Sequence, residues 1–337
     1  MTSWNDYLSS QRDCNLTLSV ADLADGFAAA ITSQGVIAVA GEEAASFLHK
    51  QLTNDVEHLG LDTARLAGYC SPKGRLQATF LMWRDAESVF LQLPHELQAP
   101  LQKRLSMFVM RAKAKLADAT PECTIGFGGA KAQAALELLF GALPASPYSK
   151  LEHESGTLIR VADAFGASRY LWLTTSTSAQ KAWPVLGTTL ALGGDDGWRL
   201  SAIHAGVPEI TASTQEQFVP QMVNYEILGG VNFKKGCYPG QEIVARSQYL
   251  GKLKRRTALA TIAATKVQAG DEVFSIADPE QPCGMVVNAA PNGAGGVDAL
   301  VEIKLAALEQ GDVRLGSAEG AALRWLDMPY PLDALDL

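Results

Sequence analysis

From about residue 256 to residue 330 the sequence is divided into short apolar runs by clusters of glycine, proline and asparagine. The runs cover 257–262, 272–276, 283–288, 297–303, 312–315 and 322–326. Short strands at such regular spacing, with turn residues between them, are typical of a small antiparallel barrel or sandwich. The sequence therefore predicts an all-β domain over 256–330. The basic, glycine-containing stretch 250–255 is the predicted hinge before it.

The preceding part of the chain mixes helical and strand-like patterns. Its strand-like runs lie at 36–39, 77–83, 88–93, 123–127, 157–162 and 169–174, and its helical patterns begin near 41, 96, 130 and 178. Strand–helix–strand–strand–helix order indicates α+β units with helices on one face of an antiparallel sheet. A chain of 337 residues is too long for one ordinary core, so we expect two or three domains. The residues before about 15 are polar, and we expect them to be loosely held.

Composition excludes several classes of protein. Hydrophobic residues make up 47% and charged residues 19%, which favours large buried cores over disorder. The N-terminus does not have a signal-peptide pattern, and no apolar run is long enough to span a bilayer. The five cysteines (14, 70, 123, 237 and 283) are odd in number and widely spaced, which argues against a disulfide framework and a structural zinc site. We therefore expect a soluble protein of a reducing compartment, the cytoplasm, with no membrane partner.

The charge is unevenly distributed. The net charge of −8 disfavours a general nucleic-acid binder, because phosphate contacts need clustered bases. Residues 234–256 nevertheless hold seven bases against one acid, Glu242: Lys234, Lys235, Arg246, Lys252, Lys254, Arg255 and Arg256. A solvated basic face is the usual explanation of such a segment. The same charge can also receive an anionic ligand or partner.

One cysteine stands out by its neighbours. The run 233–242 reads Phe-Lys-Lys-Gly-Cys-Tyr-Pro-Gly-Gln-Glu and places Cys237 beside Lys235, directly before a short helical pattern at 241–249. Nearby lysines and a helix N-terminus both favour a thiolate over a thiol. The pattern predicts a reactive or ligand-forming sulfur at Cys237. The alternative is a cysteine packed in a tight turn, and the residues alone leave both open.

This run closely resembles the signature of the YgfZ family of folate-binding proteins, which is related to the aminomethyltransferase (T-protein) of the glycine cleavage system. The matching residues are Lys-Gly-Cys-Tyr at 235–238, Gly-Gln-Glu at 240–242 and Val-Ala-Arg at 244–246. The resemblance implies an α+β fold with a folate-binding module at 17–250 and a C-terminal β-barrel at 256–330. It further implies that the module has two subdomains around a central cavity, one of 17–120 with 211–250 and one of 121–210. Tetrahydrofolate or a derivative is the implied cofactor.

The resemblance also implies binding residues. Trp198, within 197–208, matches a segment in which a tryptophan helps to bind folate, although the residues alone favour a core position for it. Amides suit the donors and acceptors of a pterin edge, so the predicted cofactor contacts are Gln217, Gln221, Asn224, Tyr238, Gln241 and Arg246. Arg246 has an alternative role as the ion-pair partner of Glu242 one turn earlier. Gln34 stands where some relatives carry a second aromatic, and Glu226 is assigned to the surface.

The implied function is that of an accessory protein that supports assembly or repair of iron–sulfur clusters, including those of tRNA-modifying enzymes. Cys237, at the rim of the cavity, is the predicted reactive thiol, with Lys235 beside it. No metal ligand set is predicted, because a cluster typically needs four cysteines, but Cys237 is a candidate shared ligand. The alternative is a folate-dependent one-carbon transferase of the aminomethyltransferase type. Residues 74–80, where those enzymes carry an aspartate, hold no carboxylate here. A third reading, an RNA-binding module, rests on the basic stretch alone, and we expect no stable nucleic-acid binding.

Overall fold

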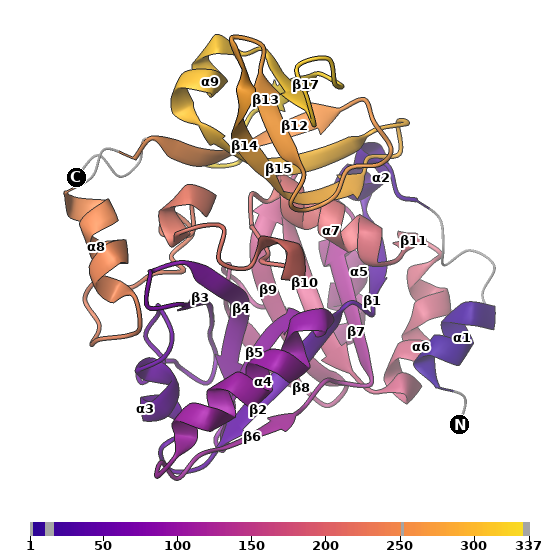
Figure 1. The fold of residues 1–337 in the computed structure, drawn as a ribbon. Coiled ribbons are helices and arrows are strands. Elements are labelled where there is room, and N and C mark those ends of the chain that lie inside the picture. The colour runs from indigo at the N-terminus through magenta and orange to yellow at the C-terminus, as the bar shows by residue number, and fades with distance from the viewer. Residues whose placement is uncertain (1–2, 11–16, 251–252, 333–337) are drawn as a thin grey trace.

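The computed structural model describes residues 3–10, 17–250 and 253–332. It is a mixed α+β structure, as expected, and its strands form three sheets (Figure 1). We call them sheet I, sheet II and the half-barrel. Gly251 and Lys252 of the predicted hinge lie outside the described residues, so that role stays a prediction.

Sheet I is antiparallel and has the order β3-β4-β5-β2-β6. Its strands are β2 (Gln34–Ala40), β3 (Ala64–Cys70), β4 (Leu76–Arg84), β5 (Ser88–Pro94) and β6 (Lys115–Asp118). Helices α3 (Ala44–His49) and α4 (His95–Val109) pack on it. Helix α4 buries Leu97, Leu101 and Leu105, which lie one turn apart and therefore on one face. This apolar stripe is what holds α4 to the sheet.

Sheet II has the order β11-β1-β7-β10-β9-β8, and only the β1–β11 pair is parallel. Its strands are β1 (Phe27–Ile31), β7 (Cys123–Gly128), β8 (Lys150–His153), β9 (Gly156–Ala164), β10 (Ala167–Thr174) and β11 (Ala191–Gly193). Successive residues of a strand point to opposite faces. Tyr170 and Trp172 accordingly join the core beneath helices α5 (Ala132–Phe140) and α6 (Ser176–Leu186), whereas Leu171 and Leu173 face sheet I. Helix α7 (Asp195–His204) also lies against this sheet.

The N-terminal helix α1 (Trp4–Ser10) is held against α6, contrary to the expectation of a loose N-terminus. Trp4 is 3% exposed and meets Trp183 edge to face, with ring centroids 5.5 Å apart. Burial of a tryptophan supplies enough apolar contact to fix this short helix. The prediction of a loose N-terminus was wrong because it weighed the polar composition of these residues and not the burial of one tryptophan.

Sheets I and II face each other across a shared apolar layer that includes Val36, Trp83, Ile159 and Leu171. The chain passes from one sheet to the other between β1 and β2, so β1 lies in sheet II with residues 121–193 while β2 lies in sheet I. The subdomain limits proposed from the sequence stay a prediction. Near the layer's edge, Tyr148 joins the sheets through its backbone, which bonds Arg160 and Ala64 at 2.7 Å each.

The C-terminal strands form a curved six-stranded sheet, the half-barrel, of order β16-β13-β14-β15-β12-β17 (Figure 1). Its strands are β12 (Arg255–Ile262), β13 (Glu272–Ser275), β14 (Asp278–Pro291), β15 (Val297–Lys304), β16 (Val313–Leu315) and β17 (Leu323–Leu326). Each coincides with one of the six runs found in the sequence. An isolated bridge between Arg314 and Ala322 links its two edge regions. The short helix α9 (Leu305–Gln310) follows β15 and was not predicted.

The segment from 205 to 250 leads from the two sheets to the half-barrel. It carries three short helices, η1 (Ala212–Thr214), η2 (Pro220–Val223) and α8 (Gln241–Tyr249). Another short helix, α2 (Val20–Asp25), lies directly before β1. Helix α8 stands apart from the sheets in Figure 1. Within the described ranges, the helices are all too short or too polar to cross a bilayer.

Candidate functional site

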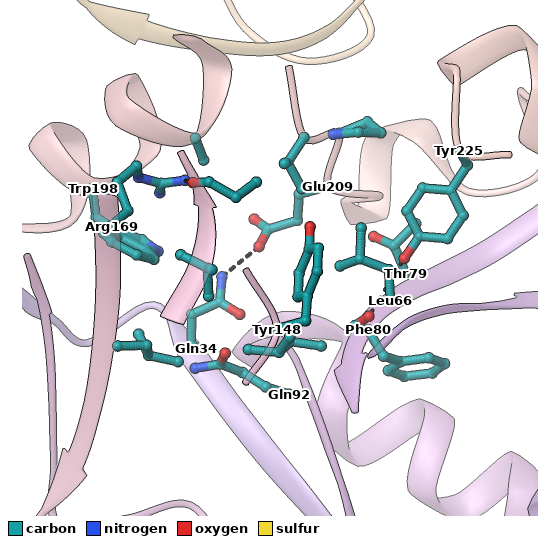
Figure 2. A pocket seen from close by; sticks show the side chains of 17 residues that line it. Gln34, Leu66, Thr79, Phe80, Gln92, Tyr148, Arg169, Trp198, Glu209 and Tyr225 are labelled. Atoms are coloured by element: carbon teal, nitrogen blue, oxygen red, sulfur yellow. Dashed lines mark hydrogen bonds between the residues drawn. The ribbon is translucent and has the colours of Figure 1, made fainter. Parts of the chain in front are cut away.

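A central cavity lies between sheets I and II and is lined by seventeen residues (Figure 2). Strands β2 to β5 supply one wall, β9 and β10 the other, and α7 with residues 207–209 closes one end. Figure 2 shows Trp198 and Arg169 on one side, Tyr225, Thr79 and Phe80 on the other, and Glu209 and Tyr148 between them. The free space is about 100 Å³. This holds several waters, so a bicyclic ring enters only when wall side chains move apart.

Trp198 is placed by a close approach of helix α7 to strand β7. At Gly126 of β7, an added Cβ would come within 2.2 Å of Cε3 of the indole, so only glycine lets the ring lie there. The Arg169 guanidinium lies over the indole ring, 4.2 Å from its centroid, which is a cation–π contact. One face of Trp198 is therefore already occupied by a cation.

Arg169 is buried at 2% exposure in strand β10. Its Nε donates to Ser201 Oγ at 3.0 Å and its Nη1 to the Ala162 carbonyl at 3.2 Å. Its Nη2 has no hydrogen-bond partner among the described residues. Burial lowers the pKa of Arg169 to about 9, although Tyr148 and Asp163 favour the charged form. A buried cation without a carboxylate on it is an unusual feature in a cavity wall.

The polar end of the cavity is formed by Glu209 and Gln34. Gln34 Nε2 donates to Glu209 Oε2 at 2.5 Å, as Figure 2 shows. The Glu209 backbone is held from both sides by Asn288 of β14, whose Oδ1 accepts from the Glu209 N–H and whose Nδ2 donates to its carbonyl, at 2.8 Å each. Burial raises the pKa of the Glu209 carboxyl, against the opposing effect of Gln34. Burial in the cavity wall thus favours the protonated form of this carboxyl group more than water does.

The Gln34–Glu209 pair also lies where the cavity adjoins a neighbouring hollow. Gln34, Trp198 and Glu209 line both the cavity and a neighbouring narrower hollow, and Glu209 and Arg199 continue into a wide outer cleft. The cleft lies between the module and the half-barrel, with His95 on one side and Asn288 on the other. A ligand with a flat head and a polar tail would place its head in the cavity, once the wall side chains move apart, and its tail in the cleft.

The structure distributes the predicted site residues over separate regions. Of the nine, all in the described part of the chain, only Trp198 lines the cavity. Gln217 is exposed, and Gln221 and Asn224 are fully buried in structural roles. Gln221 Nε2 donates to the Val244 carbonyl and Asn224 Nδ2 to the Thr257 carbonyl, both at 2.8 Å. The folate contacts assigned to them stay predictions that the cavity does not support.

The cysteine motif lies outside the cavity lining, and its rim position therefore stays a prediction. Cys237 is exposed. Lys235 Nζ donates to the carbonyls of His49 and Leu52, the latter at 2.7 Å, and lies 5.1 Å from the centre of the Tyr238 ring. Burial lowers the pKa of Lys235 to about 8, while the carboxylates Asp55 and Glu57 and Cys237 oppose the shift. The lysine thus anchors the loop that presents the thiol to solvent.

The helix that follows the cysteine exposes much of its surface. Tyr238 is buried, and its hydroxyl has no partner among the described residues. Gln241 begins α8, and Arg246 lies on its exposed side. The ion pairs of the described residues do not include one between Glu242 and Arg246, so the default pairing for Arg246 is wrong in this structure. Both side chains remain available to solvent.

Two other interpretations are settled by burial. Glu226 is not a surface residue: its side chain is fully buried and pairs with Arg256 Nη1 of β12. Burial raises the pKa of Glu226, and the charge of Arg256 opposes that shift. Residue spacing provides no signal for this pair, because the partner lies 30 positions away. Cys70 is buried, as expected, and burial raises the pKa of its thiol to about 12.

Sequence reasoning missed Arg169, Glu209 and Tyr148. Glu209 lies one residue beyond the segment 197–208 that carries Trp198. Its proximity to that segment could have marked it as a candidate site residue. Arg169 lies in β10 of sheet II and Tyr148 in the segment before β8, and only the packing of the two sheets brings them to the cavity. Within the described ranges, no group of three or more His, Cys, Asp or Glu residues is arranged to hold a metal ion.

Comparison with known proteins defines the class first. The fold is that of the aminomethyltransferase T-protein: the glycine cleavage aminomethyltransferase T from Bartonella henselae superposes with a TM-score of 0.73 over 93% of this chain and 88% of its own, at 16% identity. Two curated relatives are named tRNA-modifying protein YgfZ. The one from Escherichia coli (strain SMS-3-5 / SECEC) is 30% identical and the one from Shigella sonnei (strain Ss046) 29%, each over 236 residues, 70% of this chain and 72% of theirs. The chain belongs to the YgfZ family. A search with family models found no match.

Proposed function

We propose that the protein binds a reduced folate, tetrahydrofolate or a derivative, with the pterin ring in the central cavity. The observation that carries this proposal is the cavity itself: an indole, two amides and a carboxyl group converge in a T-protein-like fold. An aromatic wall with a few directed polar groups is what a flat heterocycle requires. The Gln34–Glu209 hydrogen bond opens as the ring enters, because it spans the way to the outer cleft.

The outer cleft accommodates the remainder of the folate in this proposal. Arg199 and His95 line it and can meet the carboxylates of the glutamate tail. Arg199 is 37% exposed and already paired with Asp196 at 2.9 Å, so its contribution is modest. Arg246, the sequence-based candidate for the tail, lies on α8 outside this cleft.

We further propose that the protein assists the assembly or repair of iron–sulfur clusters in enzymes that include tRNA-modifying ones, working in the cytoplasm. The name of the curated relatives, tRNA-modifying protein, points towards such enzymes. The exposed Cys237 supports a contact with a partner rather than with the cavity, since its thiol is accessible from outside. One cysteine does not suffice for a cluster, so iron–sulfur enzymes or assembly proteins supply the other ligands.

Equilibrium binding of tetrahydrofolate tests the cavity. Trp198→Ala removes the aromatic wall and is expected to weaken binding about tenfold or more, the equivalent of about 1.4 kcal/mol. Trp325→Ala is the matched control, because Trp325 lies in β17 of the half-barrel, away from the cavity. If the wild-type protein fails to bind tetrahydrofolate at all, the proposed function is wrong.

The cysteine is tested separately in a strain that lacks the protein. Cys237→Ser is expected to leave the activity of a cluster-dependent tRNA-modifying enzyme unrestored, whereas the wild type restores it. Cys123→Ala is the control, because it removes a buried thiol. Full rescue by Cys237→Ser would reduce the thiol to a packing role.

One observation favours the second candidate, folate-dependent one-carbon transfer. Residues 74–80 lack a carboxylate, but Glu209 places a carboxyl group with a raised pKa inside the cavity. A carboxyl group whose protonated form is favoured by burial can act as a general acid towards a bound folate nitrogen. Formation of methylenetetrahydrofolate from a small amine, lost in Glu209→Gln with folate binding intact, would establish this activity. Absence of product from the wild type leaves only the binding role.

A further inference from the structure

We infer that Arg169 holds the carbonyl oxygen of the bound ring, so that the cavity selects a 4-oxo pterin over its 4-amino counterpart. This inference rests on the proposed folate binding and adds the orientation of the ring and the chemical basis of its selection.

The first step concerns the unused donor. Arg169 lines the cavity, is 2% exposed, and spends Nε and Nη1 on Ser201 and Ala162. Nη2 alone is left without a partner among the described residues. A buried donor without a partner is costly, and a bound ligand that supplies an acceptor removes that cost.

The second step concerns the kind of ligand atom that can pair with this donor. A guanidinium has five N–H donors and no acceptor. The atom that meets Nη2 must therefore be an acceptor, and an amino group in its place would oppose donor to donor. Both hydrogen bonds of Arg169, and its position over Trp198, fix the guanidinium against turning away.

The third step concerns orientation. The other polar end of the cavity, Glu209 with Gln34, offers donors and acceptors together. The Glu209–Gln34 end can therefore form hydrogen bonds with the ring edge that carries the amino group and the ring N–H. Because only the Arg169 end demands an acceptor, the ring enters with its carbonyl towards Arg169 and its amino-bearing edge towards Glu209.

The test compares tetrahydrofolate with tetrahydroaminopterin, which differ in the oxygen or amino group at C4. Equilibrium binding of each to the wild type is expected to favour the 4-oxo compound about 10- to 100-fold, the range for a hydrogen bond to a charged group. Equal affinities would overturn the inference while leaving folate binding intact. Binding of neither compound would instead refute the proposed function.

Variants locate the preference. In Arg169→Gln the side-chain amide can pair with either substituent, so the two compounds are expected to bind within about threefold of each other. Trp325→Ala is the control: Trp325 lies in β17 of the half-barrel and does not line the cavity, so the preference is expected to persist. A preference that survives in a folded Arg169→Gln protein contradicts the inference. If that variant does not fold, the wild-type ratio decides alone.

Discussion

At the scale of single residues, Gly126 matters because its lack of a side chain lets the indole of Trp198 pack against strand β7. We expect Gly126→Ala to destabilise the protein by about 1–3 kcal/mol, because its Cβ would meet the indole of Trp198 at 2.2 Å. Displacement of that ring also predicts weaker folate binding. Urea denaturation and ligand titration measure the two effects.

Gly236→Ala is a suitable comparison for stability, because the nearest atom to its added Cβ, Nε2 of His49, is 3.8 Å away. That substitution is expected to change the free energy of unfolding by less than about 0.5 kcal/mol. Equal stability of the two variants would show that Trp198 does not depend on Gly126.

The same scale explains why the site was predicted only in part. Trp198 was identified because it lies in a continuous segment that resembles one in a known family. Arg169, Tyr148 and Gln92 each lie on or beside different strands, and none has a local pattern that marks it. For Gln221 and Asn224 the side-chain type is a weak signal, because amides that suit a pterin suit a buried carbonyl equally well.

At the scale of elements, helix α7 is tied to the β1–β2 turn by one carboxylate. Asp195 accepts from the backbone N–H and hydroxyl groups of both Thr32 and Ser33, at 2.6 to 3.0 Å. Gln34 follows directly, so this link sets the position of one end of the cavity. Acceptance by a charged group strengthens each bond.

Asp195→Ala is therefore expected to cost about 2 kcal/mol of unfolding free energy and to weaken folate binding. The neighbouring Asp196→Ala is the control: Asp196 is 55% exposed and makes one ion pair, so its loss is expected to cost less than about 1 kcal/mol. Chemical denaturation distinguishes the two. Similar losses for both would show that the turn is held by other contacts.

At the scale of the whole molecule, the half-barrel is joined to the module through a buried charge pair. Glu226 is fully buried and Arg256 8% exposed. Glu226→Gln leaves the guanidinium uncompensated, which is expected to cost about 3 kcal/mol. Asp312→Asn, within an exposed pair with Arg314 in the half-barrel, is expected to cost less than about 1 kcal/mol. A loss in Glu226→Gln no larger than in Asp312→Asn, measured by urea denaturation, would contradict this role.

The architecture at this scale was more accessible to prediction than the site. All six C-terminal strands were recognised, because turn residues and short apolar runs are local signals. The placement of β1 in sheet II, the anchoring of Trp4 and the burial of Glu226 were not, because each depends on residues far away along the chain. Local sequence patterns predict individual helices and strands, whereas contacts between residues far apart in the chain decide how these elements pack together.

Two hydrogen bonds between Asn288 and the Glu209 backbone connect strand β14 of the half-barrel to the wall of the cavity. A protein that docks on the half-barrel and displaces β14 therefore also displaces Glu209. Linkage is reciprocal: if docking changes the affinity of the cavity for its ligand by some factor, the bound ligand changes the affinity of docking by the same factor. If the cavity binds folate as proposed, folate binding and the docking of a partner on the half-barrel are expected to be coupled through Asn288.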